Sequence, residues 1–165
     1  MAQPKSATPS ELTMSRTDRV SRIITAPLGD VFDALVDRRS LETWLPPDGM
    51  SARFERFDPT PGGSYRLVLT YAEPTGAAKS SPDSDIVEAR YVEIVPNDRV
   101  VQAVDFVSDD RAFAGTMRMT WAVRAVHDGT LVEFIADEVP EGISAEDHTA
   151  GMASSLEHLA SHLEG

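Results

Sequence analysis

The sequence contains no cysteine, which excludes a disulfide framework, a thiolate nucleophile and a metal site built on cysteine. It also has no apolar run of membrane-spanning length, so we expect no membrane insertion. The first residues lack the basic and then apolar layout of a secretory signal, which favours a cytoplasmic location. No nucleophile elbow, phosphate loop, dinucleotide fingerprint or zinc motif occurs, so we predict no metal and no organic cofactor.

Positive charge is scarce: 15 lysines and arginines stand against 27 acidic residues, for a net charge of −12. Such a chain repels a phosphate backbone, and we expect no nucleic-acid partner. The 41% hydrophobic and 25% charged content is typical of a globular protein, and 165 residues suffice for one sizeable core. Residues 1–16 are rich in Pro, Ser and Thr without periodicity. We therefore predict a flexible N-terminal tail and a single domain over residues 17–165.

The last twenty or so residues predict a long amphipathic helix around which the rest of the chain is organised. Ser144 resembles an N-cap, with an acidic residue in the first turn. Apolar residues then recur at spacings of four, three and four, which places them on one helix face. This stripe is formed by Met152, Leu156, Leu159 and Leu163. A helix of this kind needs a cover, and a curved antiparallel sheet is the simplest one.

Alternating apolar residues predict seven strands, separated by turn-forming residues. The first strand, Asp18 to Ala26, precedes two short helices within residues 28–45, which Pro46 and Pro47 end. Asp128-Gly129 is a strong hairpin signal, so a meander is the economical topology. The segment 73–85 is expected to be an exposed, mobile loop. The later strands are predicted at residues 50–57, 64–72, 86–95, 100–107, 116–126 and 131–139.

Six segments carry a resemblance to a known family. They are TAPLGDVFDALVDRRSLETWL (25–45), PGGSYRL (61–67), EIVPNDRVV (93–101), GTMRMTWAV (115–123), GTLVEF (129–134) and HTAGMASSLEHLASHL (148–163). Together they resemble the family named for the activator of heat-shock protein 90 ATPase, within the START and Bet v 1-like (SRPBCC, polyketide cyclase) superfamily. The resemblance covers residues 18–164. Family members often carry Trp after the helix glycine, where this chain has Met152.

The resemblance implies an α+β helix-grip fold. In this fold a curved antiparallel sheet of about seven strands wraps around the long C-terminal helix, and two short helices follow the first strand. It also implies a cavity for apolar small molecules between sheet and helix, although a shared fold does not transfer a function.

The alternation in residues 116–126 places Met117, Met119 and Trp121 on the face toward the helix. Two thioethers and an indole suit an adaptable ligand site, although the same stripe is typical of plain core packing. The strands at 64–72 and 131–139 alternate likewise, whereas the faces of 86–95 and 100–107 are less clear and offer Tyr91 and Phe106 as their large groups. From these faces we predict a ligand cavity. Its predicted residues are Trp44, Tyr65, Leu67, Leu69, Tyr91, Phe106, Met117, Met119, Trp121, Val132, Phe134, His148, Met152 and Leu156.

Several of these residues have two interpretations. Trp44 is either a lid over the cavity or a staple that holds the second short helix to the sheet. His148 lies four residues before Met152, which places it on the cavity face as a titratable group, whereas its first-turn position favours exposure. His158 and His162 have the spacing of a metal pair but lie opposite the apolar stripe without a third ligand. We predict that these two are solvated and hold no metal.

Glu93 and Asp105 are acidic residues within predicted strands. An inward carboxylate would need a partner and would be a candidate general base, although a structural ion pair is the commoner explanation. Gly151, inside the predicted helix at a cost of about 1 kcal/mol relative to Ala, predicts close approach to a neighbouring element. The arginines available as partners for the strand acids are Arg22, Arg90 and Arg99.

These observations favour a domain that binds an apolar small molecule, such as a lipid-like, polyketide-like or aromatic ligand, with no assigned physiological role. One alternative is a cyclase-like or hydrolase-like enzyme, based on the pocket together with His148, Glu93 or Asp105. Another is a chaperone-binding module, which rests on the family name alone and ranks third. An exposed edge strand could also pair with a second copy to form a homodimer.

Overall fold

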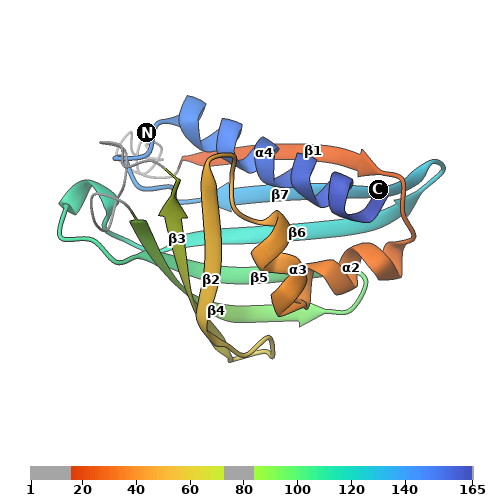
Figure 1. Ribbon diagram of the computed structural model, residues 1–165, viewed down its shortest axis with the longest axis horizontal. Coiled ribbons are helices and arrows are strands. Elements are labelled where there is room, and N and C mark those ends of the chain that lie inside the picture. The colour runs from red at the N-terminus through yellow and green to blue at the C-terminus, as the bar shows by residue number, and fades with distance from the viewer. Residues whose placement is uncertain (1–15, 73–83, 165) are drawn as a thin grey trace, which may run out of the picture.

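The computed structural model describes residues 16–72 and 84–164, which form a curved antiparallel sheet gripping one long helix (Figure 1). The seven strands are ordered β1-β7-β6-β5-β4-β3-β2. In chain order the elements are β1 (Thr17–Ile24), α2 (Leu28–Val36), α3 (Arg38–Trp44), β2 (Met50–Phe57), β3 (Ser64–Tyr71), β4 (Ser84–Val95), β5 (Arg99–Phe106), the short 3₁₀ turn η1 (Arg111–Phe113), β6 (Met117–Val126), β7 (Gly129–Asp137) and α4 (Ala145–Glu164). The predicted α+β helix-grip fold is confirmed.

The strands form a meander because β2 to β7 pair with their neighbours in chain order, and β1 then joins the free edge of β7. Register shifts interrupt two ladders, between Phe54 and Arg56 in β2 and between Tyr91 and Glu93 in β4. Such bulges bend a strand and increase its twist. They lie in the half of the sheet that curls away from β1, where the sheet must turn to enclose a space beneath α4.

The predicted tail lies outside the described residues except for Arg16, and so does most of the predicted loop 73–85. Ser84 and Asp85, placed in that loop by the sequence, instead begin β4, and Asp85 is buried. The error arose because the apolar alternation starts only at Ile86, so a strand that opens on polar residues gave no signal.

Helix α4 packs its apolar stripe against β1, α2 and α3. Met152, Leu156 and Leu159 are at most 3% exposed, as amphipathic periodicity predicts. The side chain of Ser144 accepts a hydrogen bond from the backbone N–H of Asp147 at 3.0 Å, which caps the first turn. The long helix is therefore held by burial along its length and by a conventional cap at its start.

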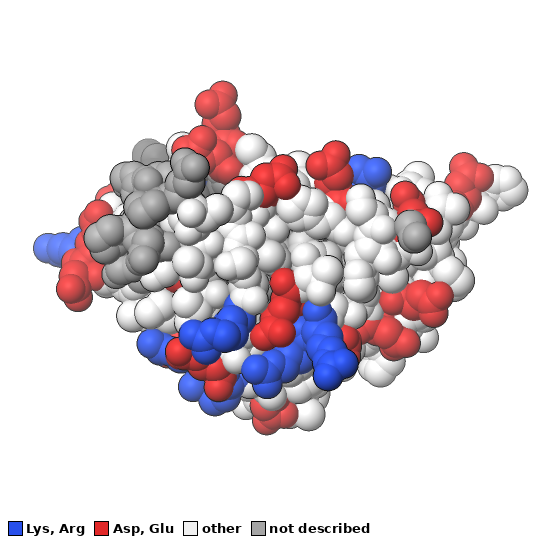
Figure 2. Space-filling model, viewed as in Figure 1, with Lys and Arg blue, Asp and Glu red and all other residues white. Residues whose placement is uncertain are grey.

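Arginines gather over the edge of the sheet formed by β2 and β3, where Figure 2 shows blue and red side chains interleaved. Arg53 and Arg66 both pair with Glu55, and Arg66 also pairs with Glu88. The positive charge of this surface is thus largely matched by neighbouring carboxylates. No helix in the described ranges is both long and apolar enough to cross a membrane.

Candidate functional site

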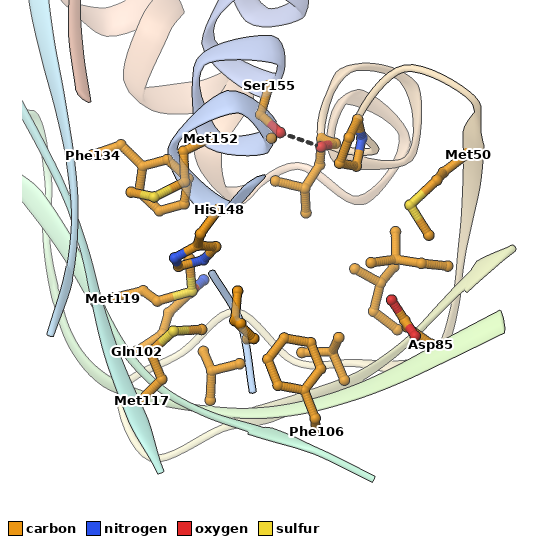
Figure 3. Close-up of a pocket in the computed structure, with 18 of the residues that line it drawn as sticks. Met50, Asp85, Gln102, Phe106, Met117, Met119, Phe134, His148, Met152 and Ser155 are labelled. Atoms are coloured by element: carbon orange, nitrogen blue, oxygen red, sulfur yellow. Dashed lines mark hydrogen bonds between the residues drawn. The ribbon is translucent and has the colours of Figure 1, made fainter. Parts of the chain in front are cut away.

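A cavity of about 680 Å³ lies between the first half of α4, the connection from α3 to β2, and the concave face of the sheet. Figure 3 shows its open centre, with His148 and Met152 on one side and Met50 and Asp85 on the other. The lining is mostly apolar. The volume lies within the range of sites that enclose small organic ligands. The protein's own side chains leave this space unfilled.

Ten of the fourteen predicted cavity residues line this space. The sheet positions them by the alternation of β3 and β6, and the close stacking of Trp121 on Phe134, with ring centroids 3.6 Å apart, forms part of the wall. The ten are Tyr65, Leu67, Leu69, Phe106, Met117, Met119, Trp121, Phe134, His148 and Met152.

Trp44 does not line the cavity. Its indole N–H donates to the carbonyl oxygen of Ala34 in α2 at 3.0 Å, and its ring meets Trp121 edge-on at a centroid distance of 5.3 Å. Only 1% of the residue is exposed. Trp44 is therefore the staple between α3, α2 and the sheet, and the lid interpretation is wrong.

Leu156 and Val132 are also absent from the cavity wall. Leu156 lies one turn beyond Met152 on the same helix face, and Val132 is fully buried in β7. At this end α2 packs against α4, β6 and β7 and fills the space that a ligand would need. Periodicity identified the correct face of each element but could not show where along that face the cavity ends.

Tyr91 lies outside the wall as well, because its ring belongs to an aromatic cluster behind it. It contacts Tyr65 with ring centroids 5.7 Å apart and Phe57 at 6.5 Å. Its hydroxyl is buried and, in the described part of the chain, makes no hydrogen bond. Tyr91 is buried on the same face of β4 as Asp85 and Val87, but it lies further along the strand than the cavity reaches.

Most of the polar groups on the wall were not predicted from the sequence. Gln102 is the clearest case, since it interrupts the apolar run of β5 and is 6% exposed. A polar residue at an inward position of a buried strand is a sequence signal for a polar group on a cavity wall. Met50 was also missed, although with it four of the six methionines line the cavity. The other missed polar lining residues are Asp48, Tyr71, Asp85, Ser144, Asp147 and Ser155.

The two strand acids considered as general bases do not reach the cavity. Glu93 binds Arg99 on the surface, with Nε and Oε1 2.8 Å apart, and the hydrogen bond to Arg99 lowers the pKa of its carboxyl. Asp105 is exposed and accepts a hydrogen bond from Thr116 Oγ1 at 2.7 Å. Among the acidic residues of the described ranges, the buried ones are Asp18 and Asp85, which are 4% and 1% exposed.

Asp18 and His148 form a close pair where β1 meets the first turn of α4. Asp18 Oδ2 lies 2.7 Å from His148 Nδ1, and Arg16 reaches both carboxylate oxygens, at 3.0 and 3.2 Å. The side chain of His148 is 14% exposed and lies on the cavity wall. Of the two interpretations of His148, the structure therefore matches the one that faces the cavity.

The chain's three tyrosines lie on or behind the wall. Burial raises the pKa of the Tyr65 phenol, and burial together with the neighbouring Tyr65 raises that of Tyr91. Burial and the charge of Asp85, whose Oδ2 lies 3.4 Å from the Tyr71 hydroxyl, raise the pKa of Tyr71. All three are neutral phenols at ordinary pH and can donate hydrogen bonds but not act as bases.

Polar contacts join α4 to the connection between α3 and β2. Ser155 Oγ donates to the carbonyl oxygen of Leu45 at 2.6 Å, the bond drawn in Figure 3. His158 lies 3.0 Å from the carbonyl oxygen of Pro46 and 2.7 Å from Asp48 Oδ1. His158 is thus part-buried and structural, and the expectation that it is simply solvated is wrong.

His162, by contrast, is exposed. Within residues 16–72 and 84–164, no three His, Asp or Glu side chains are grouped so that they could hold a metal ion. Gly151 lines the cavity, and a Cβ atom built there would meet only Pro47 Cγ, at 3.9 Å. The predicted close approach at Gly151 is therefore wrong, because 3.9 Å is an ordinary van der Waals contact.

A mostly apolar cavity with an imidazole, an amide and a phenol on its wall is a setting for ligand binding or for proton transfer. The sequence profile of the family described as Activator of Hsp90 ATPase homolog 1-like protein matches residues 25–164. The chain belongs to this family. Its helix-grip fold is that of the START and Bet v 1-like superfamily. No curated protein matches the sequence.

Solved structures similar to this family member include protein CV1439 from Chromobacterium violaceum, with 28% identity and a TM-score of 0.80 over 90% of this chain and 97% of that one. A protein from Rhodobacter sphaeroides has 21% identity and a TM-score of 0.72, covering 98% and 96% of the two chains. DynU16, from the dynemicin biosynthetic locus, has 19% identity and a TM-score of 0.64, covering 90% of this chain and 47% of that one. The last two similarities concern the fold alone.

Proposed function

We propose that this protein binds an apolar small molecule in the space between α4 and the concave sheet. The observation that carries the proposal is the cavity of about 680 Å³, which apolar side chains mostly line. Apolar area removed from water contributes about 25 cal/mol per Å², so a ligand that covers this wall gains most of its affinity from burial. The four methionines suit ligands of varied shape because thioether side chains repack easily.

The polar groups on the wall restrict the chemistry of the ligand. Asp48, Asp85 and Asp147 lie on it, and none of the described lysines or arginines does. A ligand carboxylate would have to enter next to these acids without an arginine partner on the described wall, which costs free energy. We infer that neutral molecules with a few hydrogen-bonding groups, such as aromatic or polyketide-like compounds, fit better than fatty acids.

A fluorescence titration tests the proposal. Trp121 forms part of the wall, so a neutral apolar probe such as phenylnaphthylamine should quench tryptophan emission in a saturable manner. Met152→Trp should weaken binding by at least about tenfold, equivalent to about 1.4 kcal/mol, because the larger side chain occupies the cavity. Val92→Trp is the matched control, since Val92 is 44% exposed and outside the wall.

Either of two results would contradict the binding proposal: no saturable quenching by neutral probes, or equal affinity in Met152→Trp and in the unmodified protein. Circular dichroism of each variant checks that it is folded. Mass spectrometry of the purified protein under native conditions gives an independent test, because a ligand retained from the cell would add its mass.

The chaperone-binding alternative gains no support from the surface. Its discriminating feature is a large exposed apolar patch on the convex sheet or the short helices. In the described ranges the exposed large apolar residues are Ile23 in β1, Val92 in β4 and Val107 after β5. β1 is separated from β4 and β5 by β7 and β6, so these residues form no continuous patch.

A further inference from the structure

Gln102 is a polar residue on an otherwise apolar face of β5. Val100 and Val104, two positions away on either side, are 0% and 2% exposed, and Gln102 itself is 6% exposed. Its side chain lies on the cavity wall, where Figure 3 shows it with Met117 and Met119 on one side of the open centre. Burial of an amide costs free energy unless the amide is hydrogen-bonded. Its presence at this inward position therefore needs an explanation.

The amide of Gln102 has unused hydrogen-bonding capacity that borders the cavity. Within residues 16–72 and 84–164, no group is in hydrogen-bond geometry with it. The Tyr91 hydroxyl is the described side-chain polar atom that is both unpaired and fully inaccessible. The amide atoms of Gln102 are unpaired but not fully inaccessible, and the space that they border is the cavity. A bound ligand can therefore reach them.

Tyr91 lies next to Gln102 on the neighbouring strand. The two residues are directly opposite each other in the antiparallel register of β4 and β5. Side chains in such pairs have Cβ atoms about 4.5–5.5 Å apart and interact. Burial raises the pKa of the Tyr91 phenol, and the nearby Gln102 amide opposes this increase. The inaccessible hydroxyl and the amide thus lie close together behind the wall.

The chemistry of the two groups decides which atom of the amide should face Tyr91. A neutral phenol has one proton to donate, and the side-chain carbonyl oxygen of glutamine only accepts. A contact with Oε1 therefore pairs the buried O–H group, whereas a contact with Nε2 leaves its proton without an acceptor, which costs free energy. The favoured arrangement directs Oε1 toward Tyr91 and Nε2 toward the cavity.

We propose that Gln102 selects the polar group of the ligand: Nε2 donates a hydrogen bond to a carbonyl oxygen of a bound molecule, while Tyr91 donates to Oε1 and holds the amide in this orientation. This inference rests on the proposed binding function. The ligand class is a neutral, otherwise apolar molecule with a carbonyl group. Binding completes the chain of hydrogen bonds and gives the Tyr91 hydroxyl a partner.

A buried donor changes which ligands of one shape the cavity prefers. In a wholly apolar cavity a carbonyl group loses its hydration without compensation, so a hydrocarbon of the same shape binds better. With Gln102 on the wall the carbonyl regains a hydrogen bond, and the hydrocarbon leaves the amide unpaired. The competing explanation is that water alone solvates Gln102 and that no ligand contacts it. That explanation predicts no ligand preference that depends on Gln102.

Fluorenone and fluorene form a matched pair of probes, because they are rigid molecules of nearly equal size and only fluorenone has a carbonyl oxygen. Quenching of tryptophan emission measures the affinity of each. We expect Gln102→Leu, which removes the amide at similar size, to weaken fluorenone binding about tenfold and to change fluorene binding by less than about twofold. Thr120→Val is the control, since Thr120 is next to Met119 in β6 but outside the wall. It should change neither affinity.

Tyr91 is a positioning residue in this proposal and needs a readout that altered packing would not reproduce. Tyr91→Phe should weaken fluorenone binding about fivefold and leave fluorene binding unchanged, because only the carbonyl ligand uses the oriented amide. Altered packing would change both affinities together. An equal change for the two probes, or no change for either, would overturn the role of Tyr91.

The carbonyl stretch of bound fluorenone provides a test on the unmodified protein. A hydrogen bond moves this infrared band to a lower frequency than in an alkane solvent. We expect the shift in the unmodified protein and its loss in Gln102→Leu. An alkane-like frequency in the unmodified protein would contradict the proposal whether or not any variant folds. A shift that persists in Gln102→Leu would contradict it too, because another donor would then bind the carbonyl.

Fluorenol tests the orientation of the amide, since its hydroxyl can donate a hydrogen bond. A preference for fluorenol over fluorenone that disappears in Gln102→Leu would mean that Oε1 faces the cavity, and the assigned orientation would be wrong.

The remaining outcomes separate this inference from the binding function. If both probes bind and their relative affinity is the same in Gln102→Leu and in the unmodified protein, the role of Gln102 is wrong and the binding function stands. If fluorenone, fluorene and phenylnaphthylamine all fail to bind, the binding function is wrong and the role of Gln102 falls with it.

Discussion

At the scale of single residues, the buried polar atoms show how the interior is organised. Trp44, Asp18 and Ser155 each bond a group on a different element, so their polar atoms connect α3 to α2, β1 to α4, and α4 to the end of α3. The Tyr91 hydroxyl is different, because it is buried and makes no hydrogen bond in the described part of the chain. A buried donor without a partner costs about 1–3 kcal/mol.

Tyr91→Phe should therefore stabilise the protein by about 1 kcal/mol, since it removes the unsatisfied hydroxyl and keeps the ring. The neighbouring Gln102 opposes the increase in the Tyr91 pKa, yet it lies outside hydrogen-bond geometry. Urea unfolding measures the change. Tyr91→Leu removes the ring as well as the hydroxyl. It should lower the free energy of unfolding, because the ring contacts with Tyr65 and Phe57 are worth about 0.5–1.5 kcal/mol each. Lower stability of Tyr91→Phe would mean that the hydroxyl has a partner.

Residue-level features were predictable where one local rule decided them. Alternation along β3 and β6 placed Tyr65, Met117 and Met119 on the wall. It did not show where along a strand the cavity ends, so Tyr91, which is on the same buried face of β4 as Asp85 and Val87, was wrongly placed on the wall. It could not identify Asp18 as buried, because a lone acid near the start of a strand is usually solvated. The partner that explains its burial, His148, is 130 positions away in the sequence.

At the scale of elements, α4 is divided into two functional halves. Its first half contributes Asp147, His148, Gly151 and Met152 to the cavity, and its second half packs against β1 and α2. The sequence predicted the helix and its apolar face, and Met50–Phe57 had the same bounds in prediction and structure. It could not predict this division, because the division depends on how far α2 and α3 extend over the sheet.

Gly151→Ala tests the cavity half of α4. A glycine inside a helix costs about 1 kcal/mol relative to alanine, and the added methyl group would meet only Pro47 Cγ, at 3.9 Å. We expect a gain in unfolding free energy of about 1 kcal/mol, measured by urea or thermal unfolding. Ala150→Gly, at the exposed position next to it, should lose a similar amount. A destabilised Gly151→Ala would show that another group approaches this face in solution.

At the scale of the whole molecule, the sheet and α4 enclose both the cavity and an adjoining aromatic cluster of Phe54, Phe57, Tyr65 and Tyr91. The cluster fills the curled part of the sheet behind the cavity. Because burial removes water from the tyrosine side chains, these phenols are more costly to ionise than phenols in an unfolded chain. The burial of these phenols should therefore make the free energy of unfolding depend on pH in the alkaline range.

The sign of this dependence follows from linkage. The pKa values of Tyr65, Tyr71 and Tyr91 are raised above the ordinary value of 10.0, so above that pH the folded state binds more protons than the unfolded state. Stability from these groups is fully present below about pH 10 and falls as the pH rises toward the folded pKa values. Each tyrosine that ionises only on unfolding lowers the unfolding free energy by about 1.4 kcal/mol per pH unit.

Alkaline titration should therefore show tyrosinate absorbance that appears together with the loss of native tryptophan fluorescence, as one cooperative transition. The double variant Tyr65→Phe/Tyr91→Phe is the matched control and should unfold at higher pH, since two of the three linked phenols are gone. Tyrosinate absorbance that rises around pH 10 while tryptophan fluorescence remains native would contradict the argument. It would mean that water reaches the aromatic cluster in the folded protein.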